Sequence, residues 1–533
     1  MGHVGVPPLC RHRVRRGSLH GVCARAAEPA ASAPNFPRYR SHLRQGWLFG
    51  RLRDDSDFQY KTFREHFPLL AVLLAVYCSL SWLSSRFGGG KAAQVPSLRS
   101  SGHSQSTAAP QRRFFLAVFT AVFVIALHGT NALKLGLVLL INYTIARSFG
   151  GTRVAPVLIW TFNIGTLAAV HWNDGFPWRD LSWQLGWLDD YPGLLPRWQI
   201  NFNISMLRLV SYALDLHWAR QAPPKLYEPE PEPRKRAATS LSQEKYSFGH
   251  YLLYVCYPPL FIAGPIMGFN DFVRQLDNPP RLTRASRISY AVRFAACLLT
   301  MELVLHYIYV NAIKDSKAWA GSTPMQLSMI GFWNLIIVWL KLLIPWRFFR
   351  LWALLDGVEP PENMVRCMAN NYSTMGFWRS WHRSYNLWTV RYIYVPVGGS
   401  KNLIPATLLV FTFVALWHDL SLKLLTWGWL VTAFIVPELA AAALLPAKRF
   451  GTQWWYRHVC AFGGVLNVLL MMTANLVGFA IGTEGMKYMW QELLGTWNGL
   501  RFLAAACCAL YCAVHIMFEC RAEELRHGIA RKC

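Results

Sequence analysis

The stretch "FTFVALWHDLSLKLLTWGWL", Phe411 to Leu430, decides how the chain is organised. It is apolar enough to lie in a bilayer, yet it places His418 beside Asp419 inside the run. Ionisable side chains are costly within a membrane, so function is the default interpretation of such a histidine. The alternative is an imidazole at the water interface that is satisfied by a backbone carbonyl or by Asp419.

The composition around this stretch is that of a membrane protein. Lys and Arg number 54 against 28 Asp and Glu, a net charge of +26, whereas hydrophobic residues make up 53% of the chain. A chain that is both basic and this apolar is better explained by a membrane than by nucleic acid. Its apolar residues gather in blocks of about 17 to 25, the length that lets a helix cross roughly 30 Å of hydrocarbon.

The blocks predict an all-α, polytopic bundle of about ten to twelve membrane segments, some of them re-entrant. The segments are expected near residues 67–84, 114–129, 132–147, 154–172, 202–218, 250–268, 288–310, 325–345, 403–418, 422–445, 459–482 and 499–518.

One of these segments is expected to break inside the membrane. The sequence "YVCYPPLFIAGPIMGF" carries Pro258, Pro259, Gly264 and Pro265. Broken backbone at membrane depth survives only where protein or a wet cavity buries it, so we expect a cavity near this loop. A wholly regular helix there would refute the idea.

The rest of the chain organises around one membrane domain, residues 61–520. Residues 1–60 are rich in arginine, and the positive-inside rule predicts a cytoplasmic, disordered tail; an organelle transit peptide is the alternative. Residues 86–113 and 219–248 have the Pro, Ser and charge content of linkers. Residues 521–533 are expected to form a polar C-terminal tail.

The most polar membrane-associated region is "NNYSTMGFWRSWHRSYNLWTVRYIYVPVGGS", residues 370–400. At helical spacing its large aromatic residues form one stripe, and His382 and Asn386 lie one turn apart on an adjoining stripe. One face would grip lipid or protein while the other points His382 and Asn386 into an interior. The alternative is an interfacial amphipathic helix with snorkelling arginines. Only 36 residues separate His382 from His418, enough chain to fold one back beside the other.

These two histidines suit acyl transfer. A histidine near its ordinary pKa of about 6.5 can take a proton from an attacking hydroxyl and pass it to a leaving group. No covalent enzyme intermediate is then required for transfer from a thioester. The chain lacks the nucleophile elbow, the P-loop and the H-E-x-x-H motif, and its twelve cysteines lack the paired spacing of a zinc site, so we expect no metal.

At these residues the sequence resembles the membrane-bound O-acyltransferase (MBOAT) family, within it the glycerol-uptake-protein branch related to hedgehog acyltransferase. The resemblance rests on "FWRSWHRSYNLWTVRYIYVPVGGS" followed by "FTFVALWHDL", with support from the upstream "YPPLFIAGPIMGFNDF". These motifs cover the core from about residue 250 to 430. The family's fold implies a tunnel across the membrane, with acyl-CoA entering from the cytosol and the acceptor from the lumen or bilayer.

The resemblance also assigns roles. It implies that His418 is the catalytic base and that His382, with Asn386 one turn later, orients the acceptor. Gly398 and Gly399 match a loop that shapes the reaction tunnel. From their chemistry, the candidates for the phosphates of coenzyme A are Arg379, Arg383 and Arg391. The remaining candidate substrate-binding residues are Trp378, Trp381 and Trp417.

The expected function is that of an endoplasmic-reticulum enzyme that moves a long fatty acyl group from acyl-CoA to a lipid hydroxyl. Within the branch, the resemblance points to a lysolipid acceptor, the lyso form of a glycosylphosphatidylinositol (GPI) anchor. Acyl-CoA is then a co-substrate, with no permanently bound cofactor, and membrane lipids are the other partners. The alternatives are a protein acyltransferase of the hedgehog type, and a glycerol transporter or non-catalytic scaffold. Acyl length and the side of the membrane that His418 faces stay open.

Overall fold

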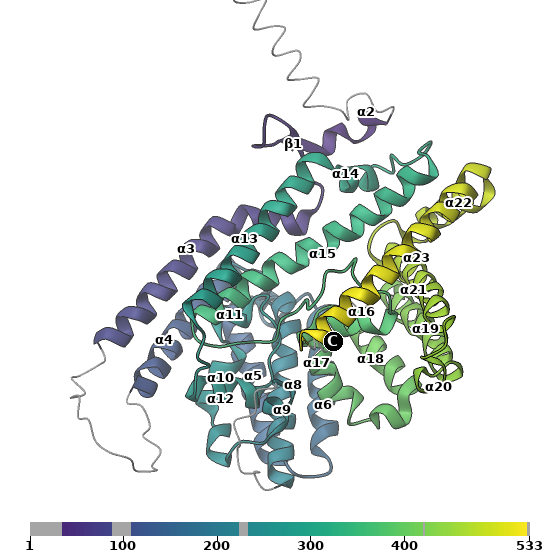
Figure 1. The fold of residues 1–533 in the computed structure, drawn as a ribbon. Helices are drawn as coiled ribbons and strands as arrows, with labels where there is room; N and C mark the ends of the chain where they lie inside the picture. The colour runs from purple at the N-terminus through teal and green to yellow at the C-terminus, as the bar shows by residue number, and fades with distance from the viewer. Residues whose placement is uncertain (1–34, 88–107, 223–232, 419–421, 530–533) are drawn as a thin grey trace, which may run out of the picture. The chain divides into compact units, whose positions relative to one another are not determined.

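A computed structural model describes residues 35–87, 108–222, 233–418 and 422–529 (Figure 1). Within these ranges the chain is mainly helical and has one two-stranded sheet, which confirms the predicted helical membrane bundle. Asp419, which precedes this last range, lies outside the described residues.

Nine candidate membrane spans are found among the described residues by length and apolar composition. They lie on α3 (Phe58–Phe87), α4 (Ala108–His128), α5 (Asn131–Phe149), α13 (Arg284–Tyr307), α15 (Pro324–Leu355), α18 (Leu403–His418) with η5 (Gly399–Asn402) before it, α19 (Leu422–Leu444), α21 (Tyr456–Phe479) and α23 (Trp497–Arg526). Of the other three expected segments, two are helical but fall outside these nine, α6 (Ala155–Trp172) and α8 (Trp198–Gln221).

The third, residues 250–268, breaks as the prolines and glycines predict. It divides into α10 (Phe248–Val255) and the four-residue α11 (Pro258–Phe261), and α12 (Phe269–Asp277) follows after non-helical backbone. A Cβ on Gly264 would lie 2.5 Å from Leu260 Cα, so only glycine fits this turn.

Shorter elements complete the described chain. They are α2 (Phe36–Tyr39), η1 (Arg40–His42), β1 (Leu43–Gln45), β2 (Leu52–Asp54), α7 (Trp178–Leu181), η2 (Trp183–Asp190), α9 (Pro233–Ala238), η3 (Gln243–Tyr246), α14 (Val310–Asp315), α16 (Thr374–Ser380), α17 (Arg383–Thr389), η4 (Val390–Tyr394), α20 (Ala447–Phe450) and α22 (Gly482–Gly495).

One compact unit combines residues up to 67 with 295–341 and 475–509. The tail expected to be disordered over 1–60 is ordered from residue 35 onward, because its apolar residues find a core. Phe36, Tyr39 and Leu43 are buried together with Tyr309 and Ala312. Strands β1 and β2 form an antiparallel hairpin beside this cluster. Residues 1–34 lie outside the description.

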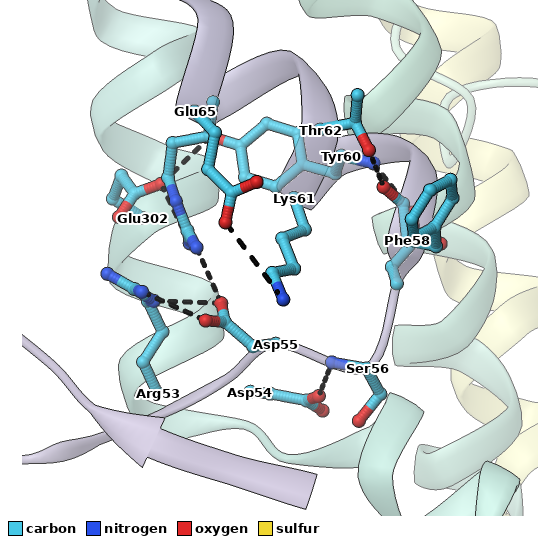
Figure 2. Close-up of polar contacts among 12 residues, drawn as sticks. Arg53, Asp54, Asp55, Ser56, Phe58, Tyr60, Lys61, Thr62, Glu65 and Glu302 are labelled. Carbon is cyan, nitrogen blue, oxygen red and sulfur yellow. Dashed lines mark hydrogen bonds and ion pairs between the residues drawn. The ribbon is translucent and has the colours of Figure 1, made fainter.

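A polar network ties that hairpin to the following helix. The carboxylate of Asp55 pairs with Arg53 Nε at a distance of 3.0 Å (Figure 2). Arg64 also pairs with Asp55, at 2.6 Å. Glu302 on α13 accepts hydrogen bonds from Tyr60 Oη at 2.9 Å and from Trp47 Nε1 at 3.1 Å. A carboxylate buried on a membrane helix is costly unless it is paired, and these contacts supply its partners.

The second unit contains the motif residues, and helices α5 and α6 pack against α8 within it. It comprises residues 68–294, 342–474 and 510–533. Arg208 of α8 is 2% exposed and donates to the carbonyls of Val255, at 2.6 Å, and Leu260. The Ile266 N–H donates to Ser384 Oγ at 2.9 Å. The polar backbone that the break frees is therefore satisfied by side chains, as membrane depth requires.

Candidate active site

The motif around His382 is two helices rather than one. The continuous helix implied by the aromatic spacing is wrong, because α16 ends at Ser380 and α17 begins at Arg383. His382, between them, has φ 45° and ψ 50°, the left-handed conformation. That conformation costs a non-glycine residue on the order of 1–3 kcal/mol, and such strain is concentrated at functional sites.

Asn363 holds the chain in this break. Its carbonyl accepts the Arg383 N–H at 3.0 Å, and its side-chain oxygen accepts the Ser384 N–H at 3.1 Å. Two amides at the start of α17 that lack helical partners are thereby satisfied. At the start of α16, the Glu438 carboxylate accepts the Met375 N–H at 3.2 Å and the Ser373 hydroxyl. Both helix starts are fixed by polar groups distant in sequence.

The His382 side chain lies between aromatic rings. Its ring stacks on Trp346 at 4.5 Å between centroids and on Tyr385 at 5.3 Å. Burial, reinforced by electrostatic repulsion between the protonated forms of His382 and His418, lowers the pKa of His382 to about 3. His382 is therefore neutral at physiological pH and can donate from one ring nitrogen while accepting at the other. The Asn386 N–H donates to the His382 carbonyl at 3.1 Å, so the predicted one-turn relation of the pair is present in the backbone.

His418 is the last residue of α18, and its neighbour Trp417 anchors it to α8. Trp417 Nε1 donates to the Asn203 carbonyl at 2.7 Å, and Asn203 Nδ2 donates to the Trp417 carbonyl at 3.0 Å. This reciprocal pair fixes the end of α18 beside α8. The Tyr385 ring stacks on Trp417 at 4.6 Å, and the Trp417 ring meets His418 edge-on at 4.7 Å. A chain of rings thus connects His382 to His418.

A cavity of about 270 Å³ opens beside His418. It is lined by residues of α6, α8 and α18, namely Leu167, Val170, His171, Gln199, Ile200, Asn203, Leu416, Trp417 and His418. The lining joins apolar side chains to a few convergent polar groups, the composition of a small-molecule site. The lining of this cavity contains no residue of the broken loop, and the cavity expected at that loop stays a prediction.

The other predicted site residues have different surroundings. Arg379 is exposed on α16, and Arg383 is half-buried. Arg391 pairs with the buried Asp215 of α8, with Nη2 and Oδ1 2.6 Å apart. Gly398 and Gly399 take φ values of 109° and 55°, in the turn that leads into α18.

The three predicted substrate-binding tryptophans also differ in their surroundings. Trp378 packs in an aromatic core, 5.4 Å from Trp427 and 5.9 Å from Phe411. Trp381 stacks on Phe377 at 5.5 Å. Of the predicted substrate-binding tryptophans, Trp417 is the one that lines the described cavity. The substrate-binding roles of the others stay predictions.

Sequence reasoning missed the contributions of α6 and α8. Asn203 and Gln199 line the cavity, and Asp215 holds Arg391, yet none belongs to the recognised motifs. A signal was available, because Asn203, Arg208 and Asp215 are polar residues within an expected membrane segment.

The fold is a helical membrane bundle, and both histidine motifs lie in its second unit. Residues 154–483 match the model of the membrane-bound O-acyltransferase family, and the chain belongs to that family. It is 45% identical to the membrane-bound O-acyltransferase GUP1 of Saccharomyces cerevisiae over 94% of this chain and 88% of that protein. It is 39% identical to GUP2 of the same yeast over 96% and 86% of the two chains. The mouse protein-cysteine N-palmitoyltransferase HHAT is 26% identical over 60% and 64%.

Proposed function

We propose that this protein transfers a long-chain acyl group from acyl-CoA to a lipid hydroxyl, with His418 as the general base. The observation that carries the proposal is the place of His418, at the end of α18 and in the wall of a cavity that joins apolar and polar side chains. A lipid acceptor brings both an acyl chain and a hydroxyl to such a site.

The reaction needs one base and no covalent enzyme intermediate. The acceptor hydroxyl attacks the thioester carbonyl carbon as His418 takes its proton. A carbon–oxygen bond forms, the carbon–sulfur bond breaks, and the proton passes from His418 to the departing thiolate of coenzyme A. His382 stays neutral and helps to orient the reactants by hydrogen bonding.

The two substrates are assigned to opposite sides of the Trp417–His418 pair. The acceptor occupies the cavity next to α6 and α8, whereas acyl-CoA lies along the segment that carries His382. Arg379 and Arg383 are the cations proposed for its phosphates, since a guanidinium pairs two phosphate oxygens at once. Arg391 is a weaker candidate, because Asp215 already neutralises it.

For the acceptor we propose a lysolipid at the endoplasmic reticulum, specifically a lyso-GPI anchor whose lipid part is remodelled. Support comes from the higher identity to relatives named O-acyltransferases than to a protein-cysteine N-palmitoyltransferase. The second candidate is acyl transfer to a protein, which the similarity to mouse HHAT favours.

The test identifies the product. Purified protein in nanodiscs receives labelled long-chain acyl-CoA with lyso-GPI, with lysophosphatidylinositol or with a hedgehog-type peptide. We expect label in the lipid fraction together with release of free coenzyme A. Label in the peptide alone would favour protein acylation over lipid acylation. The absence of coenzyme A release with every acceptor would contradict both proposals.

A further inference from the structure

Tyr385 is a tyrosine buried on α17. It is 5% exposed, and its Oη makes no hydrogen bond to the part of the chain that the structure describes. A buried hydroxyl without a partner destabilises a fold, and phenylalanine would fill the same space without that cost. The hydroxyl therefore calls for a partner beyond the residues that the structure describes.

The ring of Tyr385 is stacked between His382 and Trp417, the residue next to His418. It stacks on Trp417 at 4.6 Å with 28° between planes, and on His382 at 5.3 Å with 27°. A third ring, Trp388, lies parallel to it within 5° at 6.1 Å. Its backbone N–H donates to the His382 carbonyl at 2.9 Å. A donor fixed in this way suffers little loss of freedom when it meets a ligand atom.

The Tyr385 hydroxyl is protonated and can therefore donate a hydrogen bond. Burial raises the pKa of Tyr385 well above its ordinary value of 10, so the hydroxyl keeps its proton at physiological pH. A neutral phenol in a dry setting stabilises negative charge that develops on a carbonyl oxygen.

We infer that the Tyr385 hydroxyl donates a hydrogen bond to the thioester carbonyl oxygen of acyl-CoA and stabilises it as the acceptor hydroxyl attacks. As the new carbon–oxygen bond forms, the carbonyl oxygen gains negative charge next to Tyr385 Oη. The double bond re-forms when the carbon–sulfur bond breaks and coenzyme A leaves as the thiol. Tyr385 keeps its proton throughout, while His418 moves the proton of the acceptor. This role rests on the proposed use of acyl-CoA but not on the identity of the acceptor.

Tyr392 provides a matched control within the same motif. It is also buried, at 2% exposure, but its hydroxyl already shares a hydrogen bond with Ser211 Oγ at 2.6 Å. Removal of the Tyr392 hydroxyl therefore breaks an internal contact, whereas removal of the Tyr385 hydroxyl breaks none among the described residues. Tyr385→Phe should leave the melting temperature unchanged or raised, and Tyr392→Phe should lower it.

The decisive experiment compares two unreactive analogues of acyl-CoA. A 2-oxoalkyl-CoA, which replaces the thioester by a methylene ketone, keeps the carbonyl oxygen, and an alkyl-CoA thioether lacks it. Binding of both to wild type, Tyr385→Phe and Tyr392→Phe is measured in nanodiscs without any acceptor. We expect Tyr385→Phe to bind the ketone about fivefold more weakly, the ratio for one neutral hydrogen bond, and to bind the thioether as wild type does.

The kinetics of acyl transfer provide a second measurement. In the transfer assay, kcat of Tyr385→Phe should fall about 10²-fold, with KM for acyl-CoA changed much less. Equal ketone affinity in wild type and Tyr385→Phe would overturn the inference, as would a lowered melting temperature with kcat within threefold of wild type. If wild type binds the analogues yet acylates no lysolipid, the proposed acceptor fails while the role of Tyr385 is still decided by the analogue binding.

Discussion

Removal of Arg391 should destabilise the protein more than removal of its partner does. Asp215 is completely buried on α8, where Arg391 is its ion-pair partner and where it also accepts the Asn270 N–H at 3.3 Å. Arg391 is 19% exposed in its side chain and also covers the ring of Trp218 at 4.9 Å. Arg391→Met leaves a buried carboxylate without its counter-ion. Asp215→Leu leaves a cation that still contacts water and an aromatic ring.

The expected loss for Arg391→Met is about 3–5 kcal/mol, the cost of breaking a buried pair from one side. Asp215→Leu should cost less, and the double variant should recover most of the loss, because replacing both partners by apolar groups is often neutral. The assay is thermal unfolding of each purified variant in one detergent at one pH. An Arg391→Met protein as stable as wild type would refute this reasoning, and so would a double variant whose loss is the sum of the single losses.

The same variants decide what Arg391 does for catalysis. If it only supports the fold, the stable double variant should bind acyl-CoA with a KM close to that of wild type. If it also meets the phosphates of coenzyme A, the double variant should be stable but show a raised KM. The two roles therefore separate in a protein that still folds.

Three further changes test other parts of the structure. The folded-state pKa of His382, about 3, lies below the unfolded value near 6.5, so its neutral form stabilises the fold above pH 6.5. Stability should fall by about 1.4 kcal/mol per pH unit as pH drops from 6.5 toward 3, and thermal melts of His382→Asn across that range should show a weaker decline. Asn203→Ala removes the side-chain bond to the Trp417 carbonyl, and transfer kinetics should show kcat lowered roughly 10–10²-fold with little change in KM, since small misplacements of a catalytic group have that effect. Glu302→Gln weakens the bonds from Tyr60 and Trp47 and should cost about 1.5–3 kcal/mol in melting experiments without altering KM; a shifted KM would contradict a purely structural role.

The sequence was sufficient for the membrane helices and for the break before α12, because both follow from local properties. Apolar blocks of the right length mark nine candidate spans among the described residues, and Pro258, Pro259 and Gly264 mark the break. Hydropathy did not predict the ordered hairpin before residue 60, because the residues that pack against it lie around residue 310 in the sequence.

The site itself was only partly predictable. The His382 and His418 motifs stand out as local sequence, but helical periodicity continues across His382 and conceals the left-handed residue there. Its cause is Asn363, whose contacts come from a separate loop. The bond between Asn203 and Trp417 joins residues 214 positions apart, and no local pattern encodes such a pairing.

The most direct test of the account is acyl transfer by His418→Ala, with His458→Ala as the matched control. His458 is an exposed histidine on α21 that contacts Tyr511, away from the cavity. With labelled acyl-CoA and lysolipid, His418→Ala should lose transfer by about 10²–10⁴-fold while the control stays close to wild type and both bind the alkyl-CoA thioether normally. Transfer by His418→Ala within tenfold of wild type would contradict the claim that His418 is the base.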